Sequence, residues 1–340
     1  MKKIIGLILI LILGVGCSPS TPHIDFRHDA AGKKIDVYIG TSYFTSLIYP
    51  DTMEKPVLYP IVTTSGKEIT RGYPLRPRPF ERTDHPHHVG LWFSFGDVNG
   101  LDFWNNSFAI GPEDKPRYGS IKLKEIVEAD SKTGRMVTKS DWVNFNNRVL
   151  LEEKTTFLFA EKDGNRTIER TAELTAREPV TFTENKEGLI GIRMDRAFEE
   201  PSDKPEKFLD AQGNVTEVPV LNNEGVNGIY RNAEGLTSEK GVWGKRSRWV
   251  AVRAEKEGEI VTVVILDHPR NPNYPGWSHA RGYGLFAHNN LAGRAVDKNA
   301  HPVKLELKPG EKVVFKYKVV IGGDLDDTSI NAFSADFAKE

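Results

Sequence analysis

Three histidines, His85, His87 and His88, are grouped in one short stretch that also carries arginines and carboxylates. Imidazole can donate a proton, accept one or bind a metal near neutral pH, and a packed core does not require this mixture of side chains. One histidine in such a loop would more often bond to neighbouring backbone, but three together favour a functional site. Residues 91–95 follow directly and have the composition of a strand. We therefore predict that His87 and His88 supply acid/base chemistry where a strand begins.

A second polar and aromatic run, residues 267–289, follows a predicted strand that ends at residue 266. Its prolines and glycines predict a stiff loop, and loops on a rigid scaffold often carry binding and catalytic residues. His279, Arg281 and Tyr283 alternate along the chain, so in an extended segment their side chains share one face. We predict His279 as an acid/base residue. For Asp267 and His268, a turn at the strand end is the alternative to a functional role.

A third candidate is Glu187, which lies beside Lys186 and before a predicted strand that contains Arg193. A carboxylate in this position is a candidate general base or metal ligand, with a solvated turn charge as the alternative. A divalent metal is possible because the imidazoles and carboxylates of these runs supply nitrogen and oxygen ligands, although no spacing is diagnostic. The residues that we predict to bind substrate are Arg82, Trp92, Trp104, Arg193, Asp267, His268, Arg281 and Tyr283.

The elements that must position these residues are strands. Apolar and polar residues alternate over 121–129, 135–145, 149–159 and 166–176, with turn signals between them, which predicts an antiparallel meander. Further strands are predicted at 35–38, 57–63, 91–95, 180–183, 189–194, 249–253, 260–266, 303–307 and 313–321. Only 326–338 has a helical pattern. We predict an all-β fold, one large antiparallel β-sandwich over residues 31–340, with a C-terminal helix and an insertion or lid near 199–240.

The amino terminus predicts export. Two lysines precede an apolar run that is too short to span a bilayer, so residues 1–16 have the pattern of a signal peptide. Cys17, the only cysteine, follows small residues as in a bacterial lipobox, and residues 17–30 are predicted as a lipidated tether. We expect a protein held in the cell envelope by its lipid alone. The formal net charge is −1 without a basic block, so nucleic acid is not an expected partner.

The histidine-rich block HPHHVGLWFSFGDVNGLDFW, residues 85–104, resembles the hallmark of the PmoA-like family, which is catalogued as "methane oxygenase PmoA". Residues 186–188, 243–249, 267–269 and 279–284 resemble its other blocks, so the resemblance covers most of the chain. It implies secreted bacterial proteins associated with glycan use, and thus a carbohydrate partner. The all-β pattern also resembles the galactose mutarotase-like supersandwich, in which a histidine acid and a glutamate base act on a concave sheet. No catalytic role is carried over from that fold, because its motifs do not align.

Three functions remain open from the sequence. The first is a carbohydrate-active enzyme, a lyase, epimerase or hydrolase that acts on a sugar or modified glycoside through a His/Arg/Glu site. The second is a non-catalytic glycan-binding lipoprotein with a stacking surface formed by Trp92, Trp104, Trp243, Trp277 and Tyr274. The third is a redox metalloenzyme with histidine ligands, as the family label suggests. The titratable groups of the two runs favour the enzyme, because a binding protein does not need them.

Overall fold

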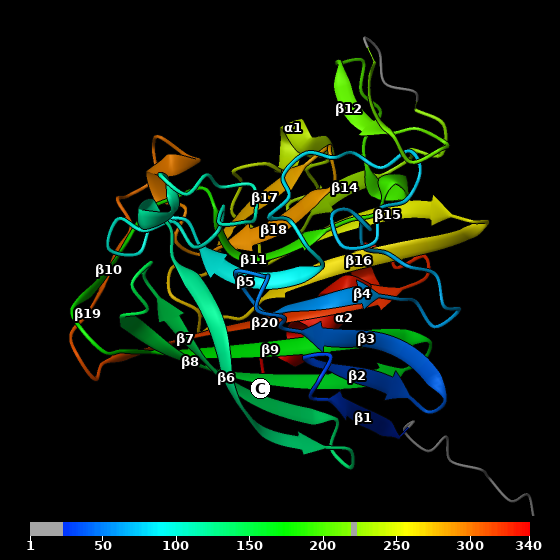
Figure 1. The fold of residues 1–340 in the computed structure, drawn as a ribbon. Helices are drawn as coiled ribbons and strands as arrows, with labels where there is room; N and C mark the ends of the chain where they lie inside the picture. Colours follow the sequence, from blue (N-terminus) through cyan, green and yellow to red (C-terminus); the bar gives the residue numbers. More distant parts are fainter. Residues whose placement is uncertain (1–22, 219–222) are drawn as a thin grey trace, which may run out of the picture.

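A computed structural model describes residues 23–218 and 223–340 of the chain, and two antiparallel eight-stranded sheets form its body (Figure 1). Sheet 1 contains, in spatial order, β1 (Ile24–Asp29), β2 (Lys34–Ile39), β3 (Ser42–Ile48), β4 (Val57–Ile61), β5 (Leu91–Phe95), β11 (Gly188–Arg193), β18 (Leu285–Asn289) and β17 (Trp277–Arg281). Sheet 2 contains β14 (Ile229–Asn232), β15 (Trp249–Lys256), β16 (Glu259–Asp267), β20 (Lys312–Gly322), β9 (Asn165–Ala176), β8 (Val149–Lys162), β7 (Arg135–Val143) and β6 (Ser120–Asp130).

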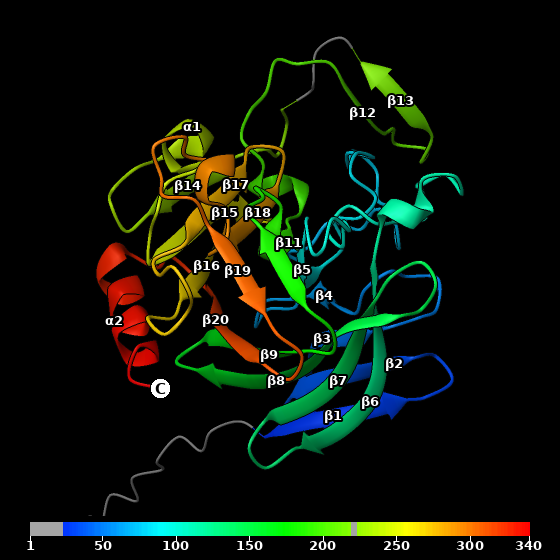
Figure 2. The same ribbon diagram turned by 90° about the vertical axis from the view of Figure 1, so that its left-hand side faces the viewer.

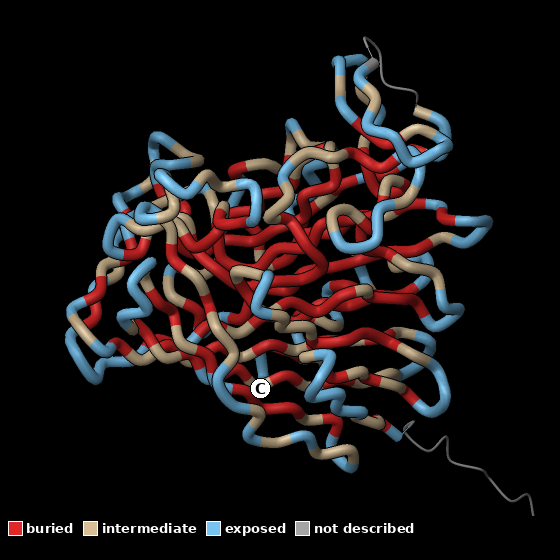
Figure 3. The backbone as a smooth tube through the Cα atoms, viewed as in Figure 1, coloured by how far each residue is buried: buried red, intermediate tan, exposed pale blue. Residues whose placement is uncertain are grey.

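The main hydrophobic core lies between the two sheets, and side chains from nearly every strand contribute to it. Every second residue of β9 is buried, as expected for a strand with one face on the core and one toward solvent. Phe93 of β5 and Phe315 of β20 meet in this core with ring centroids 5.9 Å apart. Figure 3 shows that buried segments follow the strands, whereas the connecting loops are exposed.

Shorter elements complete the sandwich. Two-stranded ribbons form from β10 (Val180–Thr183) with β19 (Lys304–Leu307), and from β12 (Glu206–Leu209) with β13 (Val215–Val218). A short helix α1 (Ser238–Val242) follows β14. The C-terminal helix α2 (Asp327–Phe337) lies against sheet 2 on the face away from sheet 1, where Ile330 and Phe337 pack on Trp249 (Figure 2). Asp326 caps this helix by accepting a hydrogen bond from the Ser329 amide.

The predicted fold class is confirmed, since the chain is mostly antiparallel strand with a short C-terminal helix. The predicted meander corresponds to β6–β9, and the helix boundaries differ from the prediction by one residue at each end. The described residues contain no helix that is long and apolar enough to cross a bilayer. Residues 1–16 and Cys17, the predicted signal and lipidation site, lie outside the described residues.

Two predictions about loops are wrong. Residues 24–29 form β1 at the edge of sheet 1, so the sandwich begins inside the segment predicted as a tether. Residues 277–281 and 285–289 form β17 and β18, although the whole run 267–289 was expected to be a loop. The prolines that suggested a loop are confined to residues 269–275, and they precede these strands. The segment predicted as an insertion, 199–240, holds the β12–β13 ribbon, which projects from the sandwich in Figure 1.

Candidate functional site

The candidate site lies on the outer face of sheet 1, by which we mean the face turned away from sheet 2. Trp92 of β5, Gly191 of β11, Ala287 of β18 and His279 of β17 pair in register across four adjacent strands. Directly paired residues point to the same side of a sheet, so Trp92 and His279 share this face. A Cβ at Gly191 would lie 2.7 Å from Trp92 and 2.9 Å from Trp104. Glycine is therefore required for both indoles to cover the strand.

His85, His87 and His88, which we call the histidine cluster, converge above β5. The His85 and His88 rings stack with centroids 4.8 Å apart, and the His87 ring meets His88 edge-on at 4.3 Å. His88 also stacks on Trp92 at 5.2 Å, so the cluster rests on the indole layer of the outer face. The irregular loop before β5 allows this convergence, which a regular strand would prevent because adjacent side chains would point to opposite faces.

Arg71 fixes the loop that carries the histidine cluster. Its fully buried guanidinium donates to the backbone carbonyls of Asp84, His85 and His88 at 2.9–3.2 Å. His85 has a positive φ of 44°, a conformation that non-glycine residues adopt rarely and at a cost of about 1–3 kcal/mol. The hydrogen bonds from Arg71 compensate this strain, so the loop is built to present its imidazoles in one arrangement.

Asp84 connects the loop to sheet 1. Its Oδ1 accepts hydrogen bonds from Arg193 at 2.6 Å and from Arg71 at 2.8 Å, and its Oδ2 bonds to His85 Nδ1. Burial disfavours the ionised carboxyl, but the charge of Arg193 and the bond to His85 outweigh it and hold the pKa of Asp84 well below its usual range. Asp84 is therefore a fixed carboxylate that orients its neighbours.

The protonation state of the histidine cluster follows from its contacts. Arg193 can only donate, so the contact of its Nη1 with His88 Nδ1 at 3.3 Å places the His88 proton on Nε2. Burial lowers the pKa of His88 well below its ordinary value, and burial together with the Lys55 charge lowers the pKa of His87 to about 2. Both rings are therefore neutral near pH 7. The Nε2 atoms of both rings are buried without a hydrogen-bond partner among the described residues.

His279 and Glu187 form a second centre on the same face. His279 Nδ1 lies 2.9 Å from the Lys186 carbonyl, which must accept, so Nδ1 carries the proton and Nε2 keeps its lone pair. Glu187 Oε2 lies 3.8 Å from the same Nδ1. Burial lowers the pKa of His279 to about 4, against the opposing charge of Glu187, so the ring is neutral near pH 7 and can accept a proton at Nε2.

Tyr283 joins the two centres. Its ring stacks on His85 at 4.9 Å with the planes 6° apart, and the guanidinium of Arg193 lies 4.9 Å from its centroid. The guanidinium of Arg281, which is paired with Glu239 at 2.8 Å, lies 5.7 Å from the centroid of the same ring. Burial raises the pKa of Tyr283 to about 12, so it stays a neutral phenol. The histidine cluster and the His279–Glu187 pair thus belong to one continuous surface.

A metal ion does not fit this surface as it is arranged. Within residues 23–218 and 223–340, no three His, Cys, Asp or Glu side chains are grouped so that they could hold one. Coordination uses the in-plane lone pair of an imidazole, and the parallel, stacked rings of His85 and His88 cannot direct theirs to one point. The Nδ1 atoms of His85, His88 and His279 are already engaged by Asp84, Arg193 and a carbonyl. We derive no step through a metal.

The structure brings nine of the twelve predicted site residues together on the outer face of sheet 1. They are His87, His88, Glu187, Arg193, His279, Arg281, Tyr283 and Trp92, with Trp104 in edge contact with Trp92 at 5.0 Å. Trp92, Trp104 and Arg193 are fully buried. These three support the surface from below, and they do not reach a ligand from their present positions.

Three predicted substrate-binding residues lie elsewhere. Arg82 is buried in ion pairs with Glu199 and Glu206, and it ties the β12–β13 ribbon to the segment before the histidine cluster. Asp267, at the end of β16, is buried and fully occupied by hydrogen bonds. His268 packs edge-on against Phe337 of α2 at 4.9 Å, on sheet 2. The turn alternative describes Asp267 and His268 better than substrate binding does.

Two residues of the site were not singled out from the sequence. Arg71 lies in a stretch with no strand or histidine next to it, and only the fold brings its guanidinium under the loop. Lys55 is 4 % exposed and lies near His87, whose pKa it helps to lower. A lysine in a polar segment is usually solvated, so the local sequence did not predict that Lys55 is buried.

Comparisons with solved structures give distant likenesses only. A GH36 alpha-galactosidase AgaA from Geobacillus stearothermophilus, in complex with raffinose, is 10% identical over 89% of this chain and 41% of its own, with a TM-score of 0.38. The galactosidase domain of an alpha-galactosidase-sucrose kinase, AgaSK, is 11% identical over 88% and 42%, with a TM-score of 0.39. This chain spans about two fifths of both. A galactose mutarotase related enzyme from Lactobacillus acidophilus is 11% identical over 89% and 98%, with a TM-score of 0.31.

These likenesses are too weak to carry an argument about activity, and no curated protein matches the chain. The resemblance to the PmoA-like family stays a prediction. A family profile matches residues 34–335, which include all of sheet 2, sheet 1 except β1, the histidine cluster and the His279–Glu187 pair. The chain therefore belongs to this family, DUF6807, which is described as a family of unknown function.

Proposed function

We propose that this protein is a carbohydrate-active enzyme that acts on a sugar or glycoside by proton transfer at the outer face of sheet 1. The observation that carries the proposal is the position of Tyr283, whose ring stacks on His85 and lies next to the guanidiniums of Arg193 and Arg281. A proton acceptor at His279 and hydrogen-bond donors at the histidine cluster thereby flank one ligand surface.

His279 is the general base of the proposed reaction. It is neutral near pH 7, because its pKa is about 4, and its Nε2 lone pair is left free by the bond from Nδ1 to the Lys186 carbonyl. Glu187, 3.8 Å from Nδ1, stabilises the imidazolium that forms when Nε2 takes a proton from the substrate. A buried base of this kind contributes roughly 10²- to 10⁴-fold to a rate.

The donors orient and polarise the ligand. Tyr283 offers a neutral hydroxyl that has no hydrogen-bond partner within residues 23–218 and 223–340, and Arg281 adds a guanidinium that is about one third exposed. Donors of this kind suit the hydroxyl and carbonyl oxygens of a sugar. Arg193 and Asp84 hold the histidine cluster in place and act as positioning residues.

The carboxylates of the site favour proton abstraction from carbon over two-carboxylate hydrolysis. Glycoside hydrolysis ordinarily uses two carboxyl groups, one of them free to donate a proton. Asp84 is occupied by Arg193, Arg71 and His85 and stays ionised. Glu239 is occupied by Arg281 and the Gly282 amide, so Glu187 is the carboxylate next to the proposed base. A neutral imidazole base beside neutral donors is suited to an epimerase or a lyase, both of which remove a proton from a sugar carbon.

The non-catalytic alternative depends on an exposed aromatic surface. Of the five aromatic residues that define it, Trp92, Trp104 and Trp277 are at most 3 % exposed. Trp243 and Tyr274 remain half-buried, and only Trp243 lies near the site, where its ring is 6.5 Å from His279. A stacking platform for a glycan needs open aromatic faces, so this arrangement favours the enzyme.

Export and lipid anchoring at Cys17 form part of the proposal and have their own test. Cys17→Ala should move the protein from the membrane fraction to the soluble fraction and abolish labelling by a radioactive fatty acid. If the variant keeps its label and stays with the membrane, the anchor lies elsewhere.

The proposed reaction is tested by hydrogen exchange at sugar carbons. The purified full chain is incubated in D₂O with a panel of free sugars and uronic acids, and deuterium incorporation and ring-unsaturated products are followed by NMR. We expect exchange with at least one sugar, loss of exchange in His279→Ala, and full exchange in His301→Ala, which changes an exposed histidine. If a sugar binds but exchanges no hydrogen for deuterium with the unmodified protein, the protein is a binding protein and not an enzyme of this kind.

A further inference from the structure

A cavity of about 280 Å³ lies next to the histidine cluster, and His87 forms part of its wall. Its other walls come from residues 52–55, 57, 74–75, 86, 89 and 106–108. Small-molecule sites usually enclose roughly 300–1,000 Å³, so this cavity is suited to a single ring. The walls are mainly apolar, and they include Val57, Val89 and Phe108.

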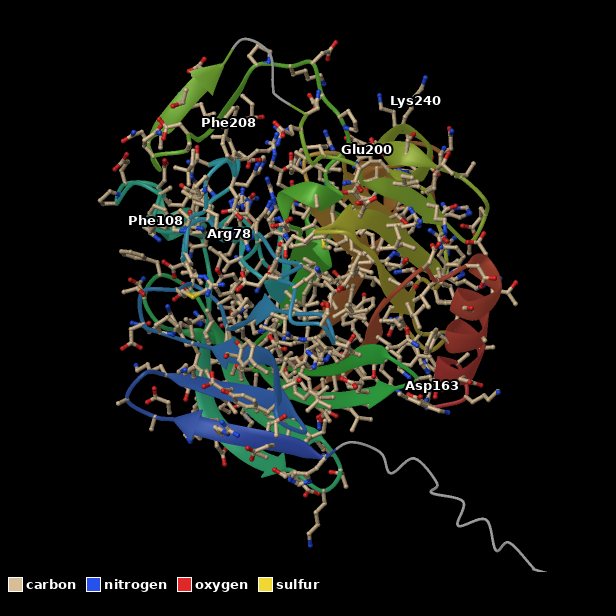
Figure 4. The ribbon with its side chains drawn as sticks, turned by 90° about the vertical axis from the view of Figure 1, so that its right-hand side faces the viewer. Arg78, Phe108, Asp163, Glu200, Phe208 and Lys240 are labelled. Atoms are coloured by element: carbon tan, nitrogen blue, oxygen red, sulfur yellow. The ribbon has the colours of Figure 1, made fainter. Side chains whose placement is uncertain are left out.

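Two large apolar side chains are exposed where they line this cavity. Phe108 is 65% exposed and Leu75 is 41% exposed, and Figure 4 shows Phe108 at the surface of the molecule. An exposed phenyl ring is stabilised when a flat apolar group covers it, and an aromatic partner adds a favourable contact between the rings. Sugar hydroxyls would find few partners here, because the Asn106 side chain is already bonded to Gly119, Ser120 and Lys115.

Lys55 provides the cationic end of the cavity. Its ammonium is buried and donates one hydrogen bond, to the Trp104 carbonyl at 2.8 Å, although an ammonium carries three donors. Burial lowers the pKa of Lys55 to about 8, with the charges of Asp102 and Glu54 opposing the shift. The lysine is therefore still mainly charged near pH 7, and two of its donors have no acceptor among the described residues.

No carboxylate in the cavity wall compensates these donors. Glu54 is the acidic residue of the lining, and it is occupied by Lys115 at 2.7 Å and by Ser120. His87 is neutral, and its buried Nε2 also lacks a partner among the described residues. The polar end of this cavity therefore calls for a ligand that brings an acceptor oxygen, and a negative charge on that oxygen would be favoured beside Lys55.

We propose that this cavity binds an aromatic ring that carries an anionic oxygen, a phenolate, with the ring against Phe108 and the oxygen on Lys55. The role of the ring rests on the proposed function: it is the aglycone of a glycoside whose sugar lies over Tyr283 and His279. In the glycoside its oxygen is bonded to the sugar. In the lyase reaction His279 takes a proton from a sugar carbon, a carbon–carbon double bond forms and the bond to the aglycone oxygen breaks, so that the ring leaves as the phenolate on Lys55. His87 contacts His85 at 5.6 Å, and His85 stacks on Tyr283, so the cavity and the sugar surface adjoin. The substrate class is then an aryl glycoside.

The proposal is tested with 4-nitrophenol, whose phenolate form absorbs at longer wavelength than the phenol. We titrate it into the full chain near pH 7 and record difference spectra. We expect a saturable phenolate band, binding weakened at least tenfold with loss of that band in Lys55→Met, and binding weakened roughly three- to tenfold in Phe108→Ala. Lys298→Met, which changes an exposed lysine outside the cavity, should leave the titration unchanged.

The absence of a saturable band with the unmodified protein would overturn the proposal, and so would an unchanged band in a folded Lys55→Met variant. Phe108→Ala changes an exposed side chain, so it keeps the test valid if Lys55→Met fails to fold. Free sugars have no aglycone, so they can exchange deuterium even if 4-nitrophenol does not bind. That result would support the proposed enzyme and refute the aglycone site. If 4-nitrophenol binds and no sugar exchanges its hydrogen, the phenolate site is supported and the proposed carbohydrate chemistry is refuted.

Discussion

Two polar clusters, one from each chemically rich run of the sequence, differ in how completely their groups are paired. The first is the histidine cluster on the outer face of sheet 1. The second, which we call the Asp267 cluster, consists of Asp267, Asn271, Asn290 and Tyr317. Asp267 accepts hydrogen bonds from Asn271 at 2.7 Å, from Asn290 at 3.0 Å and from the Gly276 amide at 2.7 Å. Tyr317 donates to Asn290, so each side chain of this cluster has a partner.

The histidine cluster is also polar and largely buried, yet two of its ring nitrogens are unpaired within the part of the chain that the structure describes. The Nε2 atoms of His87 and His88 are buried without a partner among the described residues. An unpaired buried polar group costs about 1–3 kcal/mol, a cost that a saturated network avoids. The comparison shows that residue type alone does not distinguish a structural polar residue from one that acts on a ligand. His288, whose Nε2 lies 3.4 Å from Asp267 Oδ2, also has no hydrogen bond among the described residues, so an unpaired group marks a ligand region only where it borders a surface that a ligand can reach.

The largest expected effect separates chemistry from stability. His279→Ala should lower turnover of the sugar identified by deuterium exchange by about 10²- to 10⁴-fold, because it removes the proposed base. Stability measured by denaturant unfolding should change far less than turnover. Asp267→Asn is the matched variant of the other region, and it should lower stability while turnover per folded molecule is kept. If both variants lose turnover equally, the two regions do not differ in function as we propose.

The next effect concerns the Asp267 cluster itself. Asp267→Ala leaves the donors of Asn271, Asn290 and Gly276 unpaired in a buried site, and we expect a loss of about 3 kcal/mol in the free energy of unfolding. Asp203→Ala, at an exposed carboxylate, is the control and should change stability by less than about 0.5 kcal/mol. Both are measured by denaturant unfolding. A loss no larger than that of the control would mean that the network is dispensable.

The fold could be predicted because alternation reports burial directly. The strands of the meander were predicted within a few residues, since a sheet with one face on the core imposes a period of two. The β17–β18 pair was not recognised, because Ser278, His279 and His288 are polar and yet buried on it. Their burial depends on covering loops and on strands far away in the sequence.

The candidate site could be predicted only where its residues are close in sequence. The histidine cluster was identified because three imidazoles in one loop are unusual for a core. Arg71 and Lys55 were not, since each acts through contacts with residues more than ten positions away. Asp267 and His268 were grouped with the site because they neighbour His279 in the run, but β16 ends on sheet 2 while β17 lies in sheet 1. Proximity along the chain does not fix which sheet a residue joins.

The pH dependence of stability gives a smaller effect with a definite sign. The pKa of His279 is about 4 in the folded protein and about 6.5 ordinarily, so the unfolded chain binds the extra proton between these values. This group therefore lowers stability as pH falls from 6.5 to 4, and it has no such effect above pH 6.5.

The corresponding measurement compares unfolding at pH 7.5 and pH 5. The unmodified protein should lose more stability than His279→Gln when the pH falls from 7.5 to 5, and the difference should be about 2 kcal/mol. His279 contributes only between about pH 6.5 and pH 5, and each pH unit in that window is worth about 1.36 kcal/mol. His87 and His88 remain in both proteins, so they cancel in the difference. His301→Ala should leave the loss unchanged. An unchanged loss in His279→Gln would mean that His279 is not held neutral by burial.

The smallest effect uses one hydroxyl from each region. Tyr283 contacts its neighbours through its ring alone, and among the described residues its hydroxyl has no hydrogen-bond partner, whereas the Tyr317 hydroxyl donates to Asn290. Tyr283→Phe should therefore keep stability within about 0.5 kcal/mol and weaken sugar binding by roughly three- to tenfold, the value of one hydrogen bond to a ligand. Tyr317→Phe should do the reverse, with a loss of about 1 kcal/mol in unfolding free energy and no change in binding. Calorimetric titration and denaturant unfolding measure the two quantities on the same samples. If Tyr283→Phe lowers stability as much as Tyr317→Phe and leaves binding intact, the outer face of sheet 1 is a supporting network like the Asp267 cluster, and the unpaired donors do not mark a ligand site.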